Sequence, residues 1–187
     1  MFFLLKRFIA PVYYIHCRLD DYIPFVKWFF IPYCMWYLYI FASLLYFALN
    51  AKADFYRLQA CLFIGMGLCL AFYAVFPNAI SFRPEITQTD LLSRAMAAMF
   101  RIDTSTMVLP SMHVFAAAAI HISLIKSQKT GHRRLLLALS LILVILICAS
   151  TVFIKQHSVI DVLCGLLLAL ALYFPVYRKA RERQTPK

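Results

Sequence analysis

Two short stretches place a histidine beside small polar residues at the start of a long apolar segment. The four residues from Pro110 read Pro-Ser-Met-His, and the three from Lys155 read Lys-Gln-His, with Asp161 four residues further on. Ionisable side chains at such positions are costly in a membrane and usually serve a function. Histidines, a carboxylate, a lysine and hydroxyls can together attack, protonate and bind a phosphoryl group. The sequence therefore predicts a phosphoryl-transfer site that uses no metal.

The spacing within these stretches assigns a role to each ionisable side chain. Asp161 lies four residues after His157, which predicts that the two share one face of a helix. Asp161 would then hold one ring nitrogen as N–H and leave the other free to attack phosphorus. A protonated His113 would donate to the leaving oxygen. A phosphohistidine intermediate follows from these roles.

Further residues of the same membrane face are expected to bind the phosphate. Pro110 favours the first turn of a helix, so Ser111 and the neighbouring backbone N–H groups predict an anion site at a helix N-terminus. Cationic side chains would neutralise the non-bridging oxygens. The other candidates for phosphate binding are Arg83, Lys155, Ser150 and Thr151.

These residues resemble the motifs of a known family, the type-2 phosphatidic acid phosphatase superfamily. The stretch that ends at His113 is similar to its second motif, Pro-Ser-x-His, and Arg83 with the following proline is similar to the end of its first motif, Lys-x6-Arg-Pro. Ser150, His157 and Asp161 match its third motif, Ser-Arg-x5-His-x3-Asp, in residue type and spacing. The resemblance extends over residues 76–165.

The resemblance implies a compact helix bundle with an extracytoplasmic or lumenal site, no cofactor, and metal-independent attack by His157. It also implies that Asp161 orients this nucleophile, that His113 is the general acid, and that Ser111 and Arg83 bind phosphate. The implied substrate is a phospholipid, an isoprenoid phosphate or a sphingolipid phosphate.

Two departures from the family pattern remove cations from the site. Phe76 stands at the lysine position of the first motif, and Thr151 at the arginine position of the third. Lys155 is the candidate to replace one of them. The Lys-Gln-His arrangement is similar to the branch related to inositol phosphorylceramide and sphingomyelin synthases, which pass the phosphoryl group to an alcohol. The leading interpretation is a lipid phosphate phosphatase; a lipid phosphotransferase and a non-catalytic lipid-binding or transport protein are the alternatives.

The composition is that of a membrane protein. Of the 187 residues, 64% are hydrophobic and 14% are charged, against about 25% charged residues in soluble domains. So many apolar residues cannot be buried in one small core, and lipid must be the solvent. The net charge of +11 then indicates basic loops beside an anionic leaflet rather than nucleic-acid binding. The oligomeric state is left open.

Hydropathy predicts an all-α, polytopic membrane helix bundle in a single domain, residues 1–187. Five clear transmembrane segments, each close to the ~20 residues that a membrane helix needs, are Trp28–Leu49, Leu58–Phe76, Val108–Ile125, Leu135–Ile154 and Ser158–Tyr177. Residues 1–26 are predicted to lie along the interface, with a sixth span over residues 1–16 as the alternative. The amphipathic stretch Leu91–Asp103 predicts an interfacial helix, either simply packed there or acting as a substrate gate.

Smaller features complete the prediction. Gly65 and Gly67 would permit close helix contact in the second span. His121 lies two turns deeper than His113 and is predicted to be a hydrogen-bonded helix contact. The six cysteines lack zinc or redox spacing, five of them lie inside apolar segments, and they are predicted to be packed apolar side chains.

The basic residues predict the orientation in the membrane. Three short segments on one side, residues 50–57, 126–134 and 178–187, hold 11 of the 19 Lys and Arg residues with only two opposing carboxylates. Cytoplasmic loops carry such an excess of positive charge. The C-terminus, a basic tail over residues 178–187, is therefore expected in the cytoplasm, and the histidine motifs on the opposite face.

Overall fold

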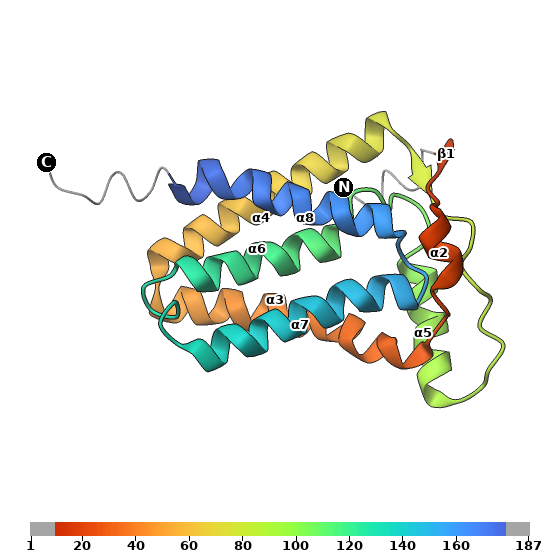
Figure 1. The fold of residues 1–187 in the computed structure, drawn as a ribbon, viewed down its shortest axis with the longest axis horizontal. Helices are drawn as coiled ribbons and strands as arrows, with labels where there is room; N and C mark the ends of the chain where they lie inside the picture. Colours follow the sequence, from red (N-terminus) through yellow and green to blue (C-terminus); the bar gives the residue numbers. More distant parts are fainter. Residues whose placement is uncertain (1–9, 179–187) are drawn as a thin grey trace, which may run out of the picture.

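The computed structural model describes residues 10–178, which form a helix bundle with short elements at one end (Figure 1). Five helices run along the long axis: α3 (Phe30–Asn50), α4 (Lys52–Val75), α6 (Met112–Lys126), α7 (Arg134–Phe153) and α8 (Val159–Tyr173). A 3-10 turn, Lys27–Phe29, leads into α3, and a π-helical turn, Phe174–Arg178, extends α8. The short elements are β1 (Tyr13–Tyr14), α2 (Arg18–Tyr22), β2 (Asn78–Ala79) and α5 (Leu91–Ile102).

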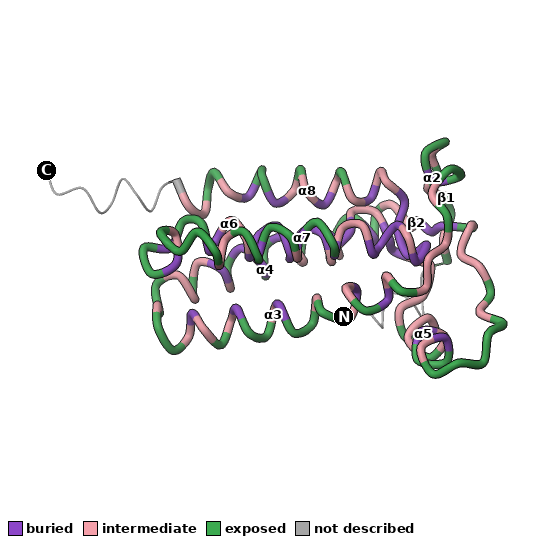
Figure 2. Tube along the Cα trace, turned by 60° about the horizontal axis from the view of Figure 1, so that its bottom comes forward, coloured by how far each residue is buried: buried purple, intermediate pink, exposed green. Residues whose placement is uncertain are grey.

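Helix α6 lies at the centre of the bundle and packs against α3, α4, α7 and α8. Its four consecutive alanines, residues 116–119, are all buried. Such small side chains let neighbouring backbones approach closely. The outward-facing residues of the surrounding helices are exposed instead (Figure 2). The helix that carries His113 is therefore enclosed by protein.

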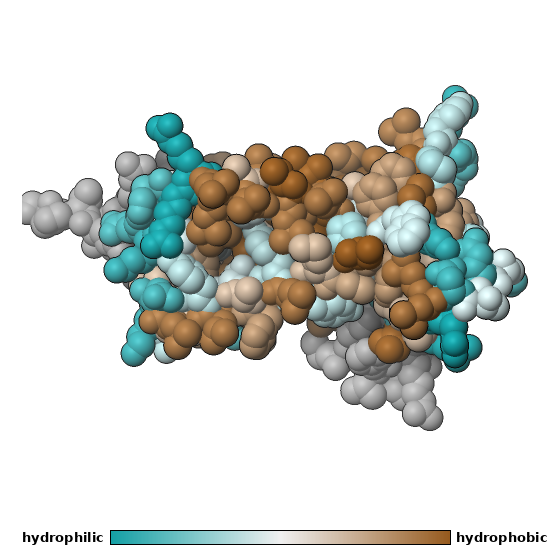
Figure 3. All heavy atoms as spheres, turned by 90° about the horizontal axis from the view of Figure 1, so that it is seen from below, coloured by the Kyte–Doolittle hydropathy of each residue, from teal (hydrophilic) through white to brown (hydrophobic). Residues whose placement is uncertain are grey.

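The surface of the bundle carries an apolar belt between two hydrophilic ends (Figure 3). Large apolar side chains on the four outer helices are exposed, among them Leu38, Phe63, Leu139 and Leu167. Four helical segments are long and apolar enough to cross a bilayer: Lys27–Asn50, Lys52–Val75, Arg134–Phe153 and Val159–Tyr177. An exposed apolar belt of this kind requires lipid as its solvent. The predicted all-α polytopic bundle is confirmed.

The third predicted span begins later than hydropathy indicated. Residues 108–111 are not helical, and α6 has only 15 residues, or about 23 Å at 1.5 Å per residue. The non-helical residues before α6 are held by the side chain of Asn78, whose Oδ1 accepts the N–H groups of Val108 and Leu109, each at 2.8 Å. The prediction that a helix begins at Val108 is wrong. Since longer helices enclose α6, it does not itself need the length of a lipid-facing span.

The described part of the N-terminal segment lies over the end of the bundle that carries the motifs (Figure 1). β1 pairs in parallel with β2, and α2 follows as a helix of five residues. Residues 10–16 are thus not a spanning helix, and residues 10–26 are not one continuous amphipathic helix. Residues 1–9 and, past Arg178, the predicted basic tail lie outside the described residues. An interfacial location for residues 10–26 stays a prediction.

The predicted helix at residues 91–103 is confirmed as α5. Asp90 caps it, since its carboxylate accepts the N–H of Ser93 at 3.2 Å. On its inner face Met96 is fully buried, in a cluster with Tyr33 of α3 and Ile154 of the turn after α7. α5 is therefore packed beside the motif residues; a gating role stays a prediction.

The prediction for His121 is confirmed. His121 Nδ1 lies 2.8 Å from Ser140 Oγ, which joins α6 to α7 as a helix contact. All six cysteines are unpaired.

Two glycines let α6 approach its neighbours. A Cβ on Gly65 of α4 would lie 1.9 Å from the ring of Phe115, so the predicted close contact is confirmed at this position. A Cβ on Gly165 of α8 would lie 2.8 Å from the carbonyl oxygen of Ser111. At Gly67 a Cβ would meet nothing within 4 Å, so the close contact predicted there is absent. Gly165 therefore sets how near the start of α6 lies to α8.

Gly165→Ala is expected to lower stability, because its methyl group would press on the backbone of Ser111. Overpacking of this kind typically costs about 1–3 kcal/mol. Thermal unfolding in detergent measures the effect, and Gly67→Ala is the matched control, with an unchanged or slightly higher Tm. Equal Tm values for the two variants would contradict a close α6–α8 contact.

Candidate active site

A tight turn between α7 and α8 positions His157. The carbonyl of Thr151 accepts two N–H groups, from Gln156 at 2.9 Å and from His157 at 3.0 Å. Lys155, which lies in this turn just before Gln156, has a φ of 57°, in the left-handed region that few residues with a side chain adopt. The chain thus reverses within a few residues, and His157 comes directly before the cap of α8.

The start of α8 is built around the Asp161 carboxylate. Ser158 is the N-cap, and its hydroxyl accepts the N–H of Ile160 at 3.2 Å. Asp161 Oδ2 accepts the N–H of Ser158 at 2.9 Å and lies 3.3 Å from His157 Nδ1. His157 precedes the helix, so the prediction that it shares a helical face with Asp161 is wrong. The capping geometry, not helical spacing, brings the two together.

A second buried carboxylate, that of Asp20 from α2, braces the same turn. It accepts from Ser158 Oγ at 2.6 Å, from Val159 N–H at 2.9 Å and from Cys17 N–H at 2.8 Å. Burial acts to raise the pKa of Asp20, but these hydrogen bonds outweigh it, and the pKa lies below its ordinary value of 3.8. Sequence reasoning missed Asp20, because Ser158 and Val159 lie nearly 140 residues away from it.

His113 lies in the first turn of α6, which Ser111 caps. The Ser111 hydroxyl accepts the N–H of Val114 at 3.4 Å, and the Ser111 N–H donates to the carbonyl of Asp161 at 3.1 Å. The second bond ties the start of α6 to the start of α8. Pro110 precedes the cap, so the prediction that it lies in the first helical turn is wrong. The prediction that Ser111 opens this helix is confirmed.

Two aromatic residues of α3 hold the ring of His113. The ring centroids of Tyr33 and Trp36 lie 4.7 Å and 4.3 Å from that of His113. Trp36 Nε1 also donates to the His113 carbonyl at 3.0 Å. Sequence reasoning did not assign these residues to the site. Their spacing of three on one helix was the available signal, since it places them on one face.

The two histidines face each other across a small cavity. Their ring centroids lie 5.8 Å apart in an edge-to-face arrangement. The cavity has a volume of about 30 Å³, which is enough for water and too small for a phosphorylated headgroup. It is lined by both histidines together with Tyr73, Asp103, Thr104, Thr106, Met107, Val108, Met112 and Gln156. A substrate would need side chains here to move.

Asp103, at the end of α5, is the carboxylate nearest to His113. Its Oδ2 lies 3.8 Å from His113 Nε2, beyond hydrogen-bond range but close enough for a strong electrostatic interaction. Tyr33 Oη donates a hydrogen bond to the same oxygen, and Gln156 Nε2 donates to the Asp103 carbonyl at 3.3 Å. Sequence reasoning missed this residue, since it belongs to none of the motifs.

Arg83 lies beside Asp103, and only part of its guanidinium is hydrogen-bonded. Its Nη1 donates to the Asp103 carbonyl at 2.9 Å, and its guanidinium lies 4.5 Å from the ring centre of Phe100. Burial lowers the pKa of Arg83 to about 10, with the Asp103 charge opposing that shift, so Arg83 is cationic at neutral pH. Its Nε and Nη2 are buried without a hydrogen-bond partner among residues 10–178.

None of the predicted phosphate ligands lines the cavity, Arg83 and Ser111 included, and the other three are engaged elsewhere. Ser150 Oγ donates to the carbonyl of Ile147 at 2.7 Å, and Thr151 Oγ1 to that of Cys148 at 2.8 Å. Lys155 Nζ donates to the carbonyl of Asp20 at 2.6 Å. The structure thus brings His113, His157 and Asp161 together, but not these three.

The comparisons with known proteins agree with the motif residues. The family model of the PAP2 superfamily matches residues 60–185, well over half of the chain. The chain belongs to the PAP2 superfamily. Membership supports phosphatase or phosphotransferase chemistry on lipid phosphates. No curated protein and no solved structure matches the chain at a significant level.

Lys155→Met tests whether this PAP2 protein uses Lys155 as the cation that its third motif lacks. The change leaves the Asp20 carbonyl without its donor, which should lower Tm. If the ammonium also reaches the phosphate, kcat should fall by about 10²–10³. Adding Thr151→Arg would then restore part of kcat without restoring Tm. An unchanged kcat would leave Lys155 with the structural contact alone.

Proposed function

We propose that this protein is a metal-independent lipid phosphate phosphatase that works through a phosphohistidine on His157. The observation that supports it most is the pairing of His157 Nδ1 with the buried Asp161 carboxylate, beside the ring of His113. Asp161 holds the proton on Nδ1, so Nε2 keeps a lone pair for attack. A family whose members act on lipid phosphates is consistent with this chemistry.

In the first step, Nε2 of His157 attacks phosphorus, and the bond between phosphorus and the lipid oxygen breaks. Protonated His113 gives its proton to the leaving oxygen, so the lipid departs as an alcohol. In the second step, His113 takes a proton from water, which attacks the phosphohistidine. The P–N bond breaks, inorganic phosphate leaves, and both histidines return to their starting states.

Arg83 is the best-supported phosphate ligand. Its Nε and Nη2 are buried donors without a partner among residues 10–178, and a cation of this kind suits the non-bridging oxygens. The first turn of α6, capped by Ser111, adds backbone N–H groups that have no intrahelical acceptor. Lys155, Ser150 and Thr151 remain proposed ligands, and each would have to leave its present acceptor.

Phosphate release from a panel of lipid phosphates in EDTA tests the function. The wild type should release phosphate, His157→Ala should release none, and Asp161→Asn should be slower by roughly 10²–10⁴. Turnover only with an added alcohol would identify a phosphotransferase. No turnover under either condition would favour a lipid-binding protein, and metal-dependent release would contradict the proposed mechanism.

The catalytic end of the bundle is proposed to face away from the cytoplasm. The basis is the excess of Lys and Arg on the connections at the other end, near Lys52 and Lys129. In intact cells, on a background without native cysteines, a cysteine at Thr89 should react with an impermeant reagent and one at Gln128 should not. The reverse pattern would show the opposite orientation.

Asp103 is proposed to stabilise the protonated form of His113. The carboxylate lies 3.8 Å from His113 Nε2 and is held by the hydroxyl of Tyr33. An opposite charge at this distance favours the imidazolium, which is the form that donates to the leaving group. Asp103 would thus act through His113 and not on the substrate directly.

Asp103→Asn is therefore expected to shift the alkaline limb of the kcat profile to lower pH, by about one unit or more. Tyr33→Phe is the control, because it removes the hydrogen bond to Asp103 but leaves the charge in place, and its profile should move less. A fall in kcat with an unmoved pH profile would give Asp103 a purely structural role.

A further inference from the structure

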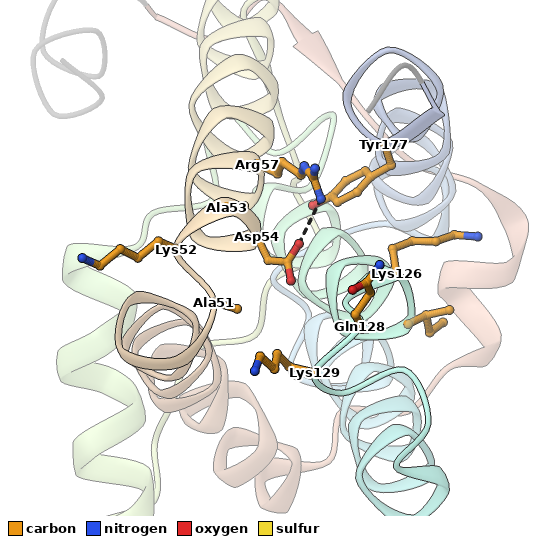
Figure 4. Close-up of a pocket in the computed structure, with 10 residues that line it drawn as sticks. Ala51, Lys52, Ala53, Asp54, Arg57, Lys126, Gln128, Lys129 and Tyr177 are labelled. Carbon is orange, nitrogen blue, oxygen red and sulfur yellow. Dashed lines mark hydrogen bonds and ion pairs between the residues drawn. The ribbon is translucent and has the colours of Figure 1, made fainter. Parts of the chain in front are cut away.

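A second and larger cavity lies at the opposite end of the bundle from the histidines. Its volume is about 460 Å³, and it opens between the start of α4, the end of α6 with the following turn, and Tyr177 (Figure 4). Nothing in the proposed mechanism uses it. Its volume falls within the range of small-ligand pockets, unlike the cavity between the histidines.

The side chains that line this cavity are strongly cationic. The lining contains one carboxylate, that of Asp54, and four cations, which together give a local charge of +3. The cations are Lys52, Arg57, Lys126 and Lys129. Within residues 10–178, Arg57 is the only one of the four cations in an ion pair, its Nη1 lying 3.1 Å from Asp54 Oδ1. Figure 4 shows Asp54 and Gln128 toward the middle, with Lys52 and Lys126 extending outward on opposite sides.

Buried hydrogen bonds hold the walls of the cavity in place. Asp54 Oδ2 accepts from Ser127 Oγ at 2.6 Å, which ties α4 to the turn after α6. Thr130 is fully buried and donates to the carbonyl of Leu124 at 2.7 Å. Tyr177 is hydrogen-bonded to Ser123 of α6. The cations therefore surround a built cavity rather than a loose basic loop.

We propose that this cavity binds the phosphate group of an anionic phospholipid, separately from the catalytic site. The charge of +3 calls for an anion, and lysine and arginine side chains are suited to phosphate oxygens. The cavity lies at one end of helices that are long and apolar enough to cross a bilayer, and the end of such a helix is where headgroups would meet it. Basic pockets between membrane helices recognise headgroups in this way. Inorganic phosphate carries the same chemistry and is the other source to distinguish.

Native mass spectrometry of the purified full chain, which counts bound lipids, tests the proposal. All samples carry His157→Ala, so that no lipid is consumed. Dioleoyl phosphatidylglycerol should bind at least tenfold more tightly than zwitterionic phosphatidylcholine. The double variant Lys52→Gln, Lys129→Gln should weaken phosphatidylglycerol binding by about tenfold, the loss expected for weakening charge-assisted contacts.

The control removes the same charge from the same end of the molecule. Arg133 and Arg134 lie outside the cavity, so the double variant Arg133→Gln, Arg134→Gln should bind phosphatidylglycerol as the parent protein does. A parallel titration with inorganic phosphate identifies the source. Binding of the lipid but not of phosphate supports a headgroup site, whereas phosphate binding that the cavity variant alone weakens would reassign the site to the free ion. Equal losses in the two double variants, or no preference over phosphatidylcholine, would overturn the proposal.

Discussion

The buried N-terminus of α8 is the constraint on which the site depends. Two carboxylates, Asp161 and Asp20, are almost fully removed from solvent there, and burying a carboxylate is costly unless hydrogen bonds offset its lost hydration. Asp161 accepts the N–H of Ser158, whereas Asp20 accepts the hydroxyl of Ser158 and the N–H of Val159. Asp161 Oδ1 is buried without a hydrogen-bond partner among residues 10–178. The hydrogen bonds to the two carboxylates fix the turn before the helix, and that turn carries His157. The orientation of the proposed nucleophile is thus a consequence of helix capping.

The distance between the histidines depends on how closely α6 approaches α8. Gly165 leaves room for the backbone at Ser111, and the Ser111 N–H donates to the carbonyl of Asp161. Asp161 therefore holds His157 with its side-chain carboxylate and anchors the start of α6 with its backbone carbonyl. His113 follows Ser111 by two residues, and its ring has little freedom, because aromatic residues of α3 pack against it. A change in the helix contact would separate the two histidines without altering either side chain.

Hydropathy could predict the helices because lipid demands apolar surfaces of a fixed length. It failed at Val108, where the chain is not helical and is held by a hydrogen bond to the side chain of Asn78, 30 residues away. The motif spacing identified His113, His157 and Asp161, which do meet, since this chemistry needs those side chains together. Asp20 and Asp103 could not be found in this way. Asp20 meets Ser158, 138 residues away, and Asp103 meets Tyr33, 70 residues away, and only the folded chain shows these pairings.

The charges around the two histidines indicate how the proposed site would hold a substrate. Asp103 and Asp161 flank the histidines, and Arg83 is the only nearby cation whose donors remain free among the described residues. Two carboxylates oppose the binding of a phosphate dianion, so the proposed site is poorly suited to retaining free phosphate. Most of the affinity would then come from the lipid part of the substrate, at about 25 cal/mol per Å² of apolar surface buried. Binding energy from that non-reacting part can hold the phosphorus near His157, while the free phosphate product, which lacks it, departs readily.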